Sequence, residues 1–253
     1  MKHIAAALIF FTRLPFWRLK AFNIPSRYFS KVITYWAVTA WLTAGVMAGT
    51  LWLAAQILPY TIAVILALLS RILLTGALHE DGLADFLDGF GGGKDKDSIL
   101  AIMKDSHIGT YGVIGLIFYF LLFFLLLSAL PLLTACTVII IADPFCKLVC
   151  SQIIRFLPYS RTAEASKSNI VYEKTALKEL FRPCLFGLLP LILIPNINLL
   201  IALLFPLLTF FFLIYLMKKK INGYTGDCCG ALFLLCELSF FIGIVIYYTL
   251  FPL

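Results

Sequence analysis

The chain has 253 residues, of which 62% are hydrophobic and only 13% are charged. Ordinary soluble domains are about 45–50% apolar. The composition therefore excludes an ordinary soluble domain and indicates a chain surrounded largely by membrane lipid. The net charge of +7 does not indicate a nucleic-acid partner, because the basic residues flank apolar runs instead of lining a polar face. A single membrane domain, 1–253, accounts for the whole length.

The first residues faintly resemble a secretory signal, with Lys2 before an apolar stretch. Arg13 closes that stretch early and no small-residue cleavage site follows, so we expect the segment to be retained. The seven cysteines form no C-x-x-C pair. We therefore expect reduced thiols that do not bind metal.

Hydropathy, interrupted at Pro, Gly, Asn and charged clusters, predicts the helices. They are 33–57, 61–79, 110–129, 132–153, 183–195, 198–217 and 230–250. The segment 183–195 is short for a membrane crossing and contains Pro190 and Pro195, so a re-entrant hairpin with the next helix is an alternative. The predicted fold class is all-α, a polytopic transmembrane bundle of six or seven helices.

The positions of Lys and Arg predict the orientation of these helices. The turns near 58–60, 130–131, 196–197 and 251–253 carry neither residue, whereas loops 80–109, 154–182 and 218–229 carry many. Positive residues in short loops stay on the cytoplasmic side, so we expect a protein of the bacterial or archaeal cytoplasmic membrane with its N-terminus inside. The three charged loops then share one compartment and can form one site, which faces the cytoplasm.

The segment after the second predicted helix is rich in acidic residues and glycine. Asp81, Asp85 and Asp88 stand at i, i+4 and i+7, which places three carboxylates on one face of a helix. Mg²⁺ takes oxygen ligands from carboxylates and substrate phosphate, so the pattern predicts a metal site formed by these three residues. Gly91 and Gly92 follow, and glycines let backbone N–H groups approach an anionic substrate. The alternative is a solvated acidic helix end with a flexible glycine loop.

Further polar residues stand at the mouths of later helices. Lys104 and Asp105 precede the third predicted helix, where Lys104 would neutralise phosphate charge; alternatively, both residues only mark the membrane boundary. His107 has no ligand spacing to another histidine, so we expect it not to bind metal. Arg161 lies in the loop after the fourth helix, and arginine binds phosphate in bidentate fashion.

Asp227 lies between glycines at the start of the last predicted helix. Two interpretations stay open: its carboxylate completes the metal site, or it caps the helix through the N-terminal N–H groups.

Four charged residues fall inside predicted membrane helices, namely Arg71, Asp143, Lys147 and Glu237. Charges in hydrocarbon are costly, so these residues should face a cavity or pair with one another. A pair between Asp143 and Lys147, four residues apart, and contact with substrate are both open.

Several of these segments together resemble the cobalamin synthases, which are adenosylcobinamide-GDP ribazoletransferases. The matching stretches are Phe11 to Pro15, Asp81 to Gly89, Lys104 to Gly112, and Thr225 to Ala231 with Glu237. They occur in the expected order over most of the chain. The sequence departs from the family after Arg161, where Thr162, Ala163 and Glu164 replace a frequent Gly-Leu-Gly run.

The resemblance implies the joining step of cobalamin assembly. A hydroxyl of α-ribazole, or of its 5′-phosphate, would attack the cobinamide-linked phosphorus of adenosylcobinamide-GDP and expel GMP. Mg²⁺ held by Asp81, Asp85 and Asp88 would neutralise the diphosphate. Lys104, Arg13 or Arg161 would add positive charge, and Asp105 or Asp227 would be the general base.

Three other functions remain open at this stage. Asp85 to Gly89 also fits the Asp-x-x-Asp-Gly element of CDP-alcohol phosphotransferases, and an intramembrane prenyltransferase also has aspartate-rich motifs. A transporter that binds a coupling cation is the alternative from another class. Acidic residues at the membrane midplane would favour transport, whereas acidic residues at the inner boundary favour transfer to a cytosolic diphosphate.

Overall fold

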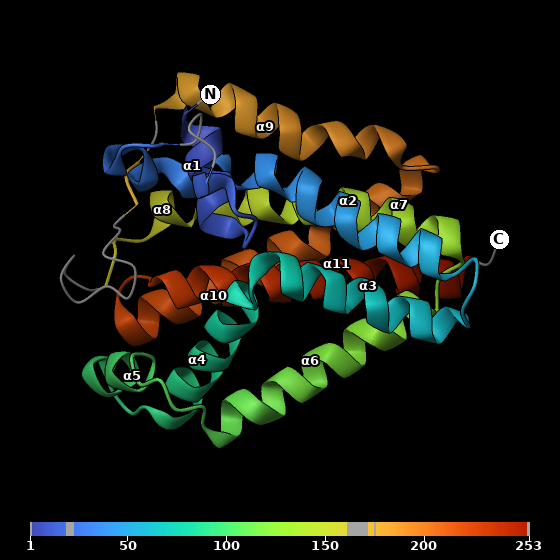
Figure 1. Ribbon diagram of the computed structural model, residues 1–253. Coiled ribbons are helices and arrows are strands. Elements are labelled where there is room, and N and C mark those ends of the chain that lie inside the picture. Colours follow the sequence, from blue (N-terminus) through green and yellow to red (C-terminus); the bar gives the residue numbers. More distant parts are fainter. Residues whose placement is uncertain (1, 19–22, 161–171, 175, 252–253) are drawn as a thin grey trace.

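The computed structural model describes the chain except for residues 1, 19–22, 161–171, 175 and 252–253 (Figure 1). The described residues form helices and no strand, which confirms the predicted all-α bundle. The long axis of the bundle is set by helices that lie lengthwise beside one another: α2 (Trp36–Ala54), α3 (Tyr60–Thr75), α7 (Leu132–Ser151), α10 (Leu204–Ile221) and α11 (Gly226–Leu250). α2 packs against α3 and α7, and α11 packs against α7 and α10.

Five helical segments in the described part of the chain are long and apolar enough to cross a membrane, or six if the bent pair α3 and α4 (Leu78–Gly92) is counted as one span. The five are Ser26–Ala54, Thr110–Ser128, Leu132–Phe156, Ile197–Ile221 and Gly226–Leu250. The predicted helix 183–195 is divided into α9 (Phe181–Leu188) and the 3₁₀ helix η5 (Leu189–Leu193). Pro190 lies in the first turn of η5, where a residue without an N–H interrupts the α-helical hydrogen-bond pattern.

The predicted helix 61–79 implied that the acidic segment continues from it. In the structure the acidic segment belongs to a separate helix. α3 ends at Thr75, and α4 starts at Leu78 at an angle of 90° to it. Gly76 and Ala77 form the bend with φ of +68° and +57°, a left-handed conformation that glycine adopts readily. The Arg13 side chain lies where a Cβ on residue 76 would stand. The bend turns α4 across the end of the bundle, towards α6 (Thr110–Ser128) and α11 (Figure 1).

The N-terminal segment is an integral part of the bundle. α1 (Lys2–Phe11) packs on the 3₁₀ helix η3 (Ser26–Tyr35), which leads directly into α2. The His3 ring stacks on Tyr35 with 5.3 Å between ring centroids, and Phe11 stacks on Trp36 at 5.1 Å. α1 therefore covers the start of α2.

The described parts of the charged loops lie together at one end of the bundle, with α1, α4, α5 (Lys96–Ile102) and α8 (Ile153–Phe156), opposite the end at which α11 finishes (Figure 1). Two of these loops are joined by backbone hydrogen bonds. Ser160 N–H donates to the Tyr224 carbonyl at 2.8 Å, and Tyr224 N–H donates to the Pro158 carbonyl at 3.0 Å. The predicted convergence of loops 154–182 and 218–229 is therefore present at Tyr159 and Tyr224.

Candidate active site

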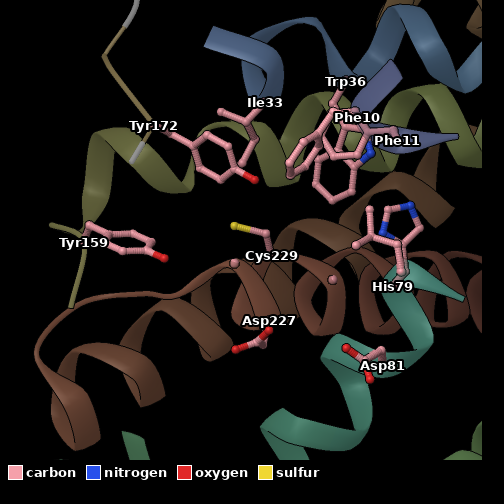
Figure 2. Close-up of a pocket in the computed structure, with 13 residues that line it drawn as sticks. Phe10, Phe11, Ile33, Trp36, His79, Asp81, Tyr159, Tyr172, Asp227 and Cys229 are labelled. Carbon is pink, nitrogen blue, oxygen red and sulfur yellow. The ribbon is translucent and has the colours of Figure 1, made fainter. Parts of the chain in front are cut away.

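A pocket of about 280 Å³ opens between the first turns of α4 and α11, and α1 and the start of α2 cover it (Figure 2). We call it the α4–α11 pocket. Its apolar walls are formed by Phe10, Phe11, Ile33, Trp36 and Leu78. Its polar lining includes the carboxylates of Asp81 and Asp227 and the phenol rings of Tyr159 and Tyr172. Two of the predicted site residues, distant in the sequence, thus face the same pocket.

Glycines allow α4 and α11 to cross closely enough to bring these carboxylates together. A Cβ on Gly82 would stand 2.9 Å from the Asp227 carbonyl oxygen, and a Cβ on Gly230 would stand 3.0 Å from the His79 carbonyl oxygen. Real Cβ atoms do not approach oxygen so closely without displacing it. Glycine at both positions therefore sets the distance between the two helices, and with it the width of the pocket.

Asp227 is not the N-cap residue of α11. The N-cap of α11 is Thr225, whose Oγ1 accepts a hydrogen bond from the Cys228 N–H at 3.3 Å. Asp227 is the second residue of the helix, and its half-buried carboxylate lines the pocket. Asp81 likewise lies in the first turn of α4. The positive ends of two helix dipoles thus converge on the pocket, an arrangement that favours carboxylates and phosphate groups there.

The three aspartates of α4 share one face but have different surroundings. Asp81 is exposed, Asp85 is half-buried, and Asp88 is buried. Asp88 Oδ2 accepts from the Gly109 N–H at 2.7 Å, and Oδ1 accepts from the Gly112 N–H at 2.8 Å. Because Gly109 is the N-cap residue of α6, the Asp88 carboxylate caps α6 from a neighbouring helix. Both of its oxygens are thereby engaged by backbone.

The carboxylates suit a magnesium ion that also binds substrate. No group of three or more His, Cys, Asp or Glu side chains in the described part of the chain is arranged around a common metal position. Mg²⁺ commonly takes only one or two protein carboxylates together with water and substrate phosphates. Asp81 and Asp85, one helical turn apart on the same face of α4, meet that requirement without Asp88.

The predicted glycine loop is helical. Gly91 and Gly92 form the last turn of α4, and the Tyr111 ring lies against Gly91. The Gly93 N–H donates to the Gly89 carbonyl at 2.8 Å. These glycines allow side chains of neighbouring elements to pack closely on α4, and they lie at the opposite end of α4 from the pocket.

Lys104 and Asp105 follow α5, are exposed, and do not line the α4–α11 pocket. The Asp105 carboxylate accepts hydrogen bonds from the His107 N–H at 3.0 Å and contacts the His107 ring at 2.7 Å. Hydrogen bonding by the His107 backbone and ring lowers the pKa of Asp105. A carboxylate of lowered pKa is a weaker proton acceptor.

Of the two predicted substrate-binding arginines, Arg13 contacts the bend between α3 and α4 and is not among the residues that line the pocket. Its N–H donates to the Leu74 carbonyl at 2.7 Å, and its exposed side chain covers Gly76. Phe11 and Leu78, each two residues from these contact points, line the pocket. Arg161 lies outside the described residues.

The charges inside the membrane helices form pairs beneath the pocket. The Arg71 guanidinium binds both Glu237 oxygens at 2.7 and 2.6 Å and donates to Tyr119 Oη at 2.9 Å. Lys147 Nζ lies 2.6 Å from Asp143, so the predicted pair four residues apart is present. Both pairs are buried. Pairing of this kind neutralises charges that would be costly in hydrocarbon.

Sequence reasoning missed the aromatic residues of the pocket. Phe10, Phe11 and Trp36 stand in apolar runs, where an aromatic residue is usually taken as packing, and Tyr159 and Tyr172 stand in a loop. One signal in the sequence could have indicated Phe11 as a pocket residue: it stands in the stretch Phe11 to Pro15, which also contains the predicted substrate-binding residue Arg13.

Comparison with known proteins identifies relatives over almost the whole chain. A family model described as cobalamin-5-phosphate synthase matches residues 3–245. Proteins named adenosylcobinamide-GDP ribazoletransferase from Shewanella putrefaciens and a second Shewanella strain are each 35% identical over 243 residues, which is 95% of this chain and 92% of the relative. The protein of that name from Shewanella oneidensis is 34% identical over 244 residues, with the same coverage. No solved structure matches the chain.

Proposed function

The chain belongs to the cobalamin-5-phosphate synthase family, and from this premise we propose that its α4–α11 pocket joins ribazole to adenosylcobinamide-GDP. The chain is a transferase, and the reaction is the one in its relatives' name. The observation that carries the assignment of the site is the pair of carboxylates, Asp81 and Asp227, that face one pocket from two converging helix N-termini.

The transfer forms one bond and breaks one. A ribose hydroxyl oxygen of α-ribazole, or of its 5′-phosphate, bonds to the phosphorus attached to cobinamide. The bond from that phosphorus to the bridging oxygen breaks, and GMP leaves with the bridging oxygen and its electron pair. The hydroxyl proton passes to a base of the protein, and the product is adenosylcobalamin or its 5′-phosphate.

Asp81 and Asp85 would hold a magnesium ion, since they lie on the face of α4 that starts at the pocket. Bound Mg²⁺ would neutralise negative charge on the diphosphate as the phosphorus–oxygen bond breaks. We exclude Asp88 from this set because its oxygens already accept hydrogen bonds from α6. The positive ends of α4 and α11 attract the same phosphates.

Asp227 is the proton acceptor in this proposal, as an aspartate is in protein kinases. It lines the pocket across from Asp81, whereas Asp105 does not line it and has a lowered pKa. Arg13, whose side chain covers Gly76 two residues before the pocket residue Leu78, would contact phosphate. With the topology predicted from Lys and Arg, the pocket faces the cytoplasm, where both substrates are soluble.

The direct test is to incubate the purified protein in detergent with adenosylcobinamide-GDP and α-ribazole and to identify the products by mass spectrometry. We expect adenosylcobalamin and GMP in equal amounts, no turnover in excess EDTA, and recovery when Mg²⁺ is restored. Absence of both products from a folded wild-type protein would refute the proposed function. Full turnover in EDTA would refute only the metal requirement.

A further inference from the structure

The α4–α11 pocket has two chemically different sides (Figure 2). On one side, ring systems gather from α1 and from the start of α2, and Phe10, Phe11 and Trp36 are drawn there beside Ile33. On the other side, the carboxylates of Asp81 and Asp227 stand on α4 and α11. A ligand that fills this pocket must have one apolar, flat end and one polar end.

The aromatic side is rigidly supported. The Phe11 and Trp36 rings stack at 5.1 Å with 13° between their planes. Trp36 also contacts the Phe233 ring at 5.4 Å, and Phe233 lies under Lys147 Nζ at 4.7 Å. The aromatic wall is therefore packed against Phe233 and, through it, against the buried ion pair of Lys147 and Asp143. A preformed aromatic surface binds a planar ligand without first having to be ordered.

The size of the pocket limits which substrate it encloses. Its volume of about 280 Å³ is at the small end of ligand pockets, which are about 300–1,000 Å³. A nucleoside is of this size. Adenosylcobinamide-GDP, with a corrin macrocycle and two nucleosides, is far larger, so only a part of it would enter.

We propose that the aromatic side of the pocket binds the fused-ring benzimidazole base of ribazole, with the ribose directed to Asp227. This inference rests on the proposed function and adds which substrate occupies the pocket. With the base against the half-buried Phe10 ring, which the buried Phe11 and Trp36 rings support from behind, the ribose hydroxyls point to the carboxylate side, where the proton is accepted. The two sides of the pocket thus orient the attacking nucleoside.

The guanine of the GDP moiety is also planar, but it fits the aromatic side less well. Guanine carries an exocyclic amine, a ring N–H and a carbonyl along one edge. Phe10, Phe11 and Ile33 offer no side-chain partners for these groups. Trp36 Nε1 and His79 Nε2 are buried polar atoms of the lining that lack a partner, but two such atoms cannot satisfy all three groups on the guanine edge, and burying polar groups without partners is costly. Benzimidazole carries only its two ring nitrogens, one of which is bonded to the ribose.

Substitution of the aromatic wall tests the inference. In Phe10→Leu, we expect the KM and the dissociation constant for α-ribazole to rise about tenfold, as when a stacking ring is removed, while the KM for adenosylcobinamide-GDP changes less than about twofold. Trp36→Leu removes the buried ring that supports this wall through Phe11 and should shift the same values in the same direction. The dissociation constant is measured by calorimetry in EDTA, so it does not depend on turnover. Trp52→Leu, an exposed tryptophan elsewhere on α2, is the matched control and should leave all of these values unchanged.

The possible failures are distinguishable. If the wild type makes adenosylcobalamin but both wall variants bind α-ribazole normally, the inference is overturned and the proposed function stands. Variants that lose affinity for GMP or adenosylcobinamide-GDP instead would assign the wall to guanine and also overturn it. Trp36 is buried and Phe10 is only half-buried, so Phe10→Leu decides the matter if Trp36→Leu does not fold.

Discussion

Asp81 and Asp88 lie on one face of α4, but their carboxylates differ in exposure and in hydrogen bonding. Asp81 is exposed at the pocket, whereas Asp88 is buried and accepts two backbone hydrogen bonds from α6. A Cβ on either Gly109 or Gly112 would stand 2.5 Å from an Asp88 oxygen. Glycine at both positions therefore makes the cap possible, and the cap fixes α6 on α4.

Asp88→Asn should therefore affect mainly stability, whereas Asp81→Asn should affect mainly the Mg²⁺ dependence of turnover. Asn at position 88 keeps one acceptor oxygen but places its amide NH₂, a donor, against a backbone N–H, so we expect the free energy of unfolding to fall by about 1–3 kcal/mol with unchanged Mg²⁺ dependence. Asn at the exposed position 81 should cost at most about 1 kcal/mol, the interaction of the carboxylate with the helix dipole, and should raise the Mg²⁺ concentration needed for half-maximal turnover. Thermal unfolding and a Mg²⁺ titration of turnover measure both effects. A stable Asp88→Asn protein that needs more Mg²⁺ would return Asp88 to the metal site.

For individual residues, the sequence predicted which residue types form the site better than it predicted their roles. Spacing placed the three aspartates of α4 on one face, but spacing contains no information about α6, whose N-terminus engages Asp88. The assignment of Asp227 to the pocket depended on the predicted topology. The aromatic wall has no polar signature, so only the packing of α1 on η3 and α2 reveals it.

The crossing of α4 and α11 is the element on which the site depends. Its contact residues include Gly82, against the Asp227 backbone, and Gly230, against the His79 backbone. The bend at Gly76 and Ala77 turns α4 into this crossing. Hydropathy predicted one helix over 61–79 because the apolar run continues past Gly76; only the left-handed conformation at Gly76 and Ala77 separates α3 from α4.

Adding one methyl group at the crossing should damage the site. In Gly82→Ala, the new Cβ would meet the Asp227 backbone, so the helices must separate; we expect a loss of about 1–3 kcal/mol in unfolding free energy and reduced turnover. The matched control is Gly49→Ala in α2, where nothing lies within 4 Å of the new Cβ. That variant should be as stable as wild type or up to about 1 kcal/mol more stable. Equal turnover and stability in the two variants would contradict the close crossing.

In the described part of the molecule, the charged loops 80–109 and 218–229 lie at one end of the bundle, and the uncharged turns near 58–60, 130–131 and 196–197 lie at the other (Figure 1). Long apolar runs and the distribution of Lys and Arg were sufficient to predict this arrangement, because both reflect the membrane as solvent. The number of spans was harder to predict, since α3 is short and bent against α4, and 183–195 is divided at Pro190.

The orientation predicts which positions are reached from outside the cell. Single cysteines are introduced at Lys94, Lys219 and Asn198 on a cysteine-free background and treated with a membrane-impermeant maleimide. Position 198, near an uncharged turn, should react in intact cells, whereas 94 and 219 should react only after permeabilisation. Labelling of 94 or 219 in intact cells would refute a pocket that faces the cytoplasm.

The central claim is that α4 and α11 form one active site, and Asp227→Asn tests it most directly. Since Thr225 caps α11, Asp227→Asn removes only the interaction of the carboxylate with the helix dipole, which is about 0.3–1 kcal/mol, so thermal stability in detergent should stay close to that of wild type. Turnover should fall by at least about 10²-fold, because the amide accepts no proton. Asp105→Asn, the same change outside the pocket, should keep most of its turnover. Near-normal turnover in Asp227→Asn, with Asp105→Asn inactive, would contradict the assignment of the site to this pocket.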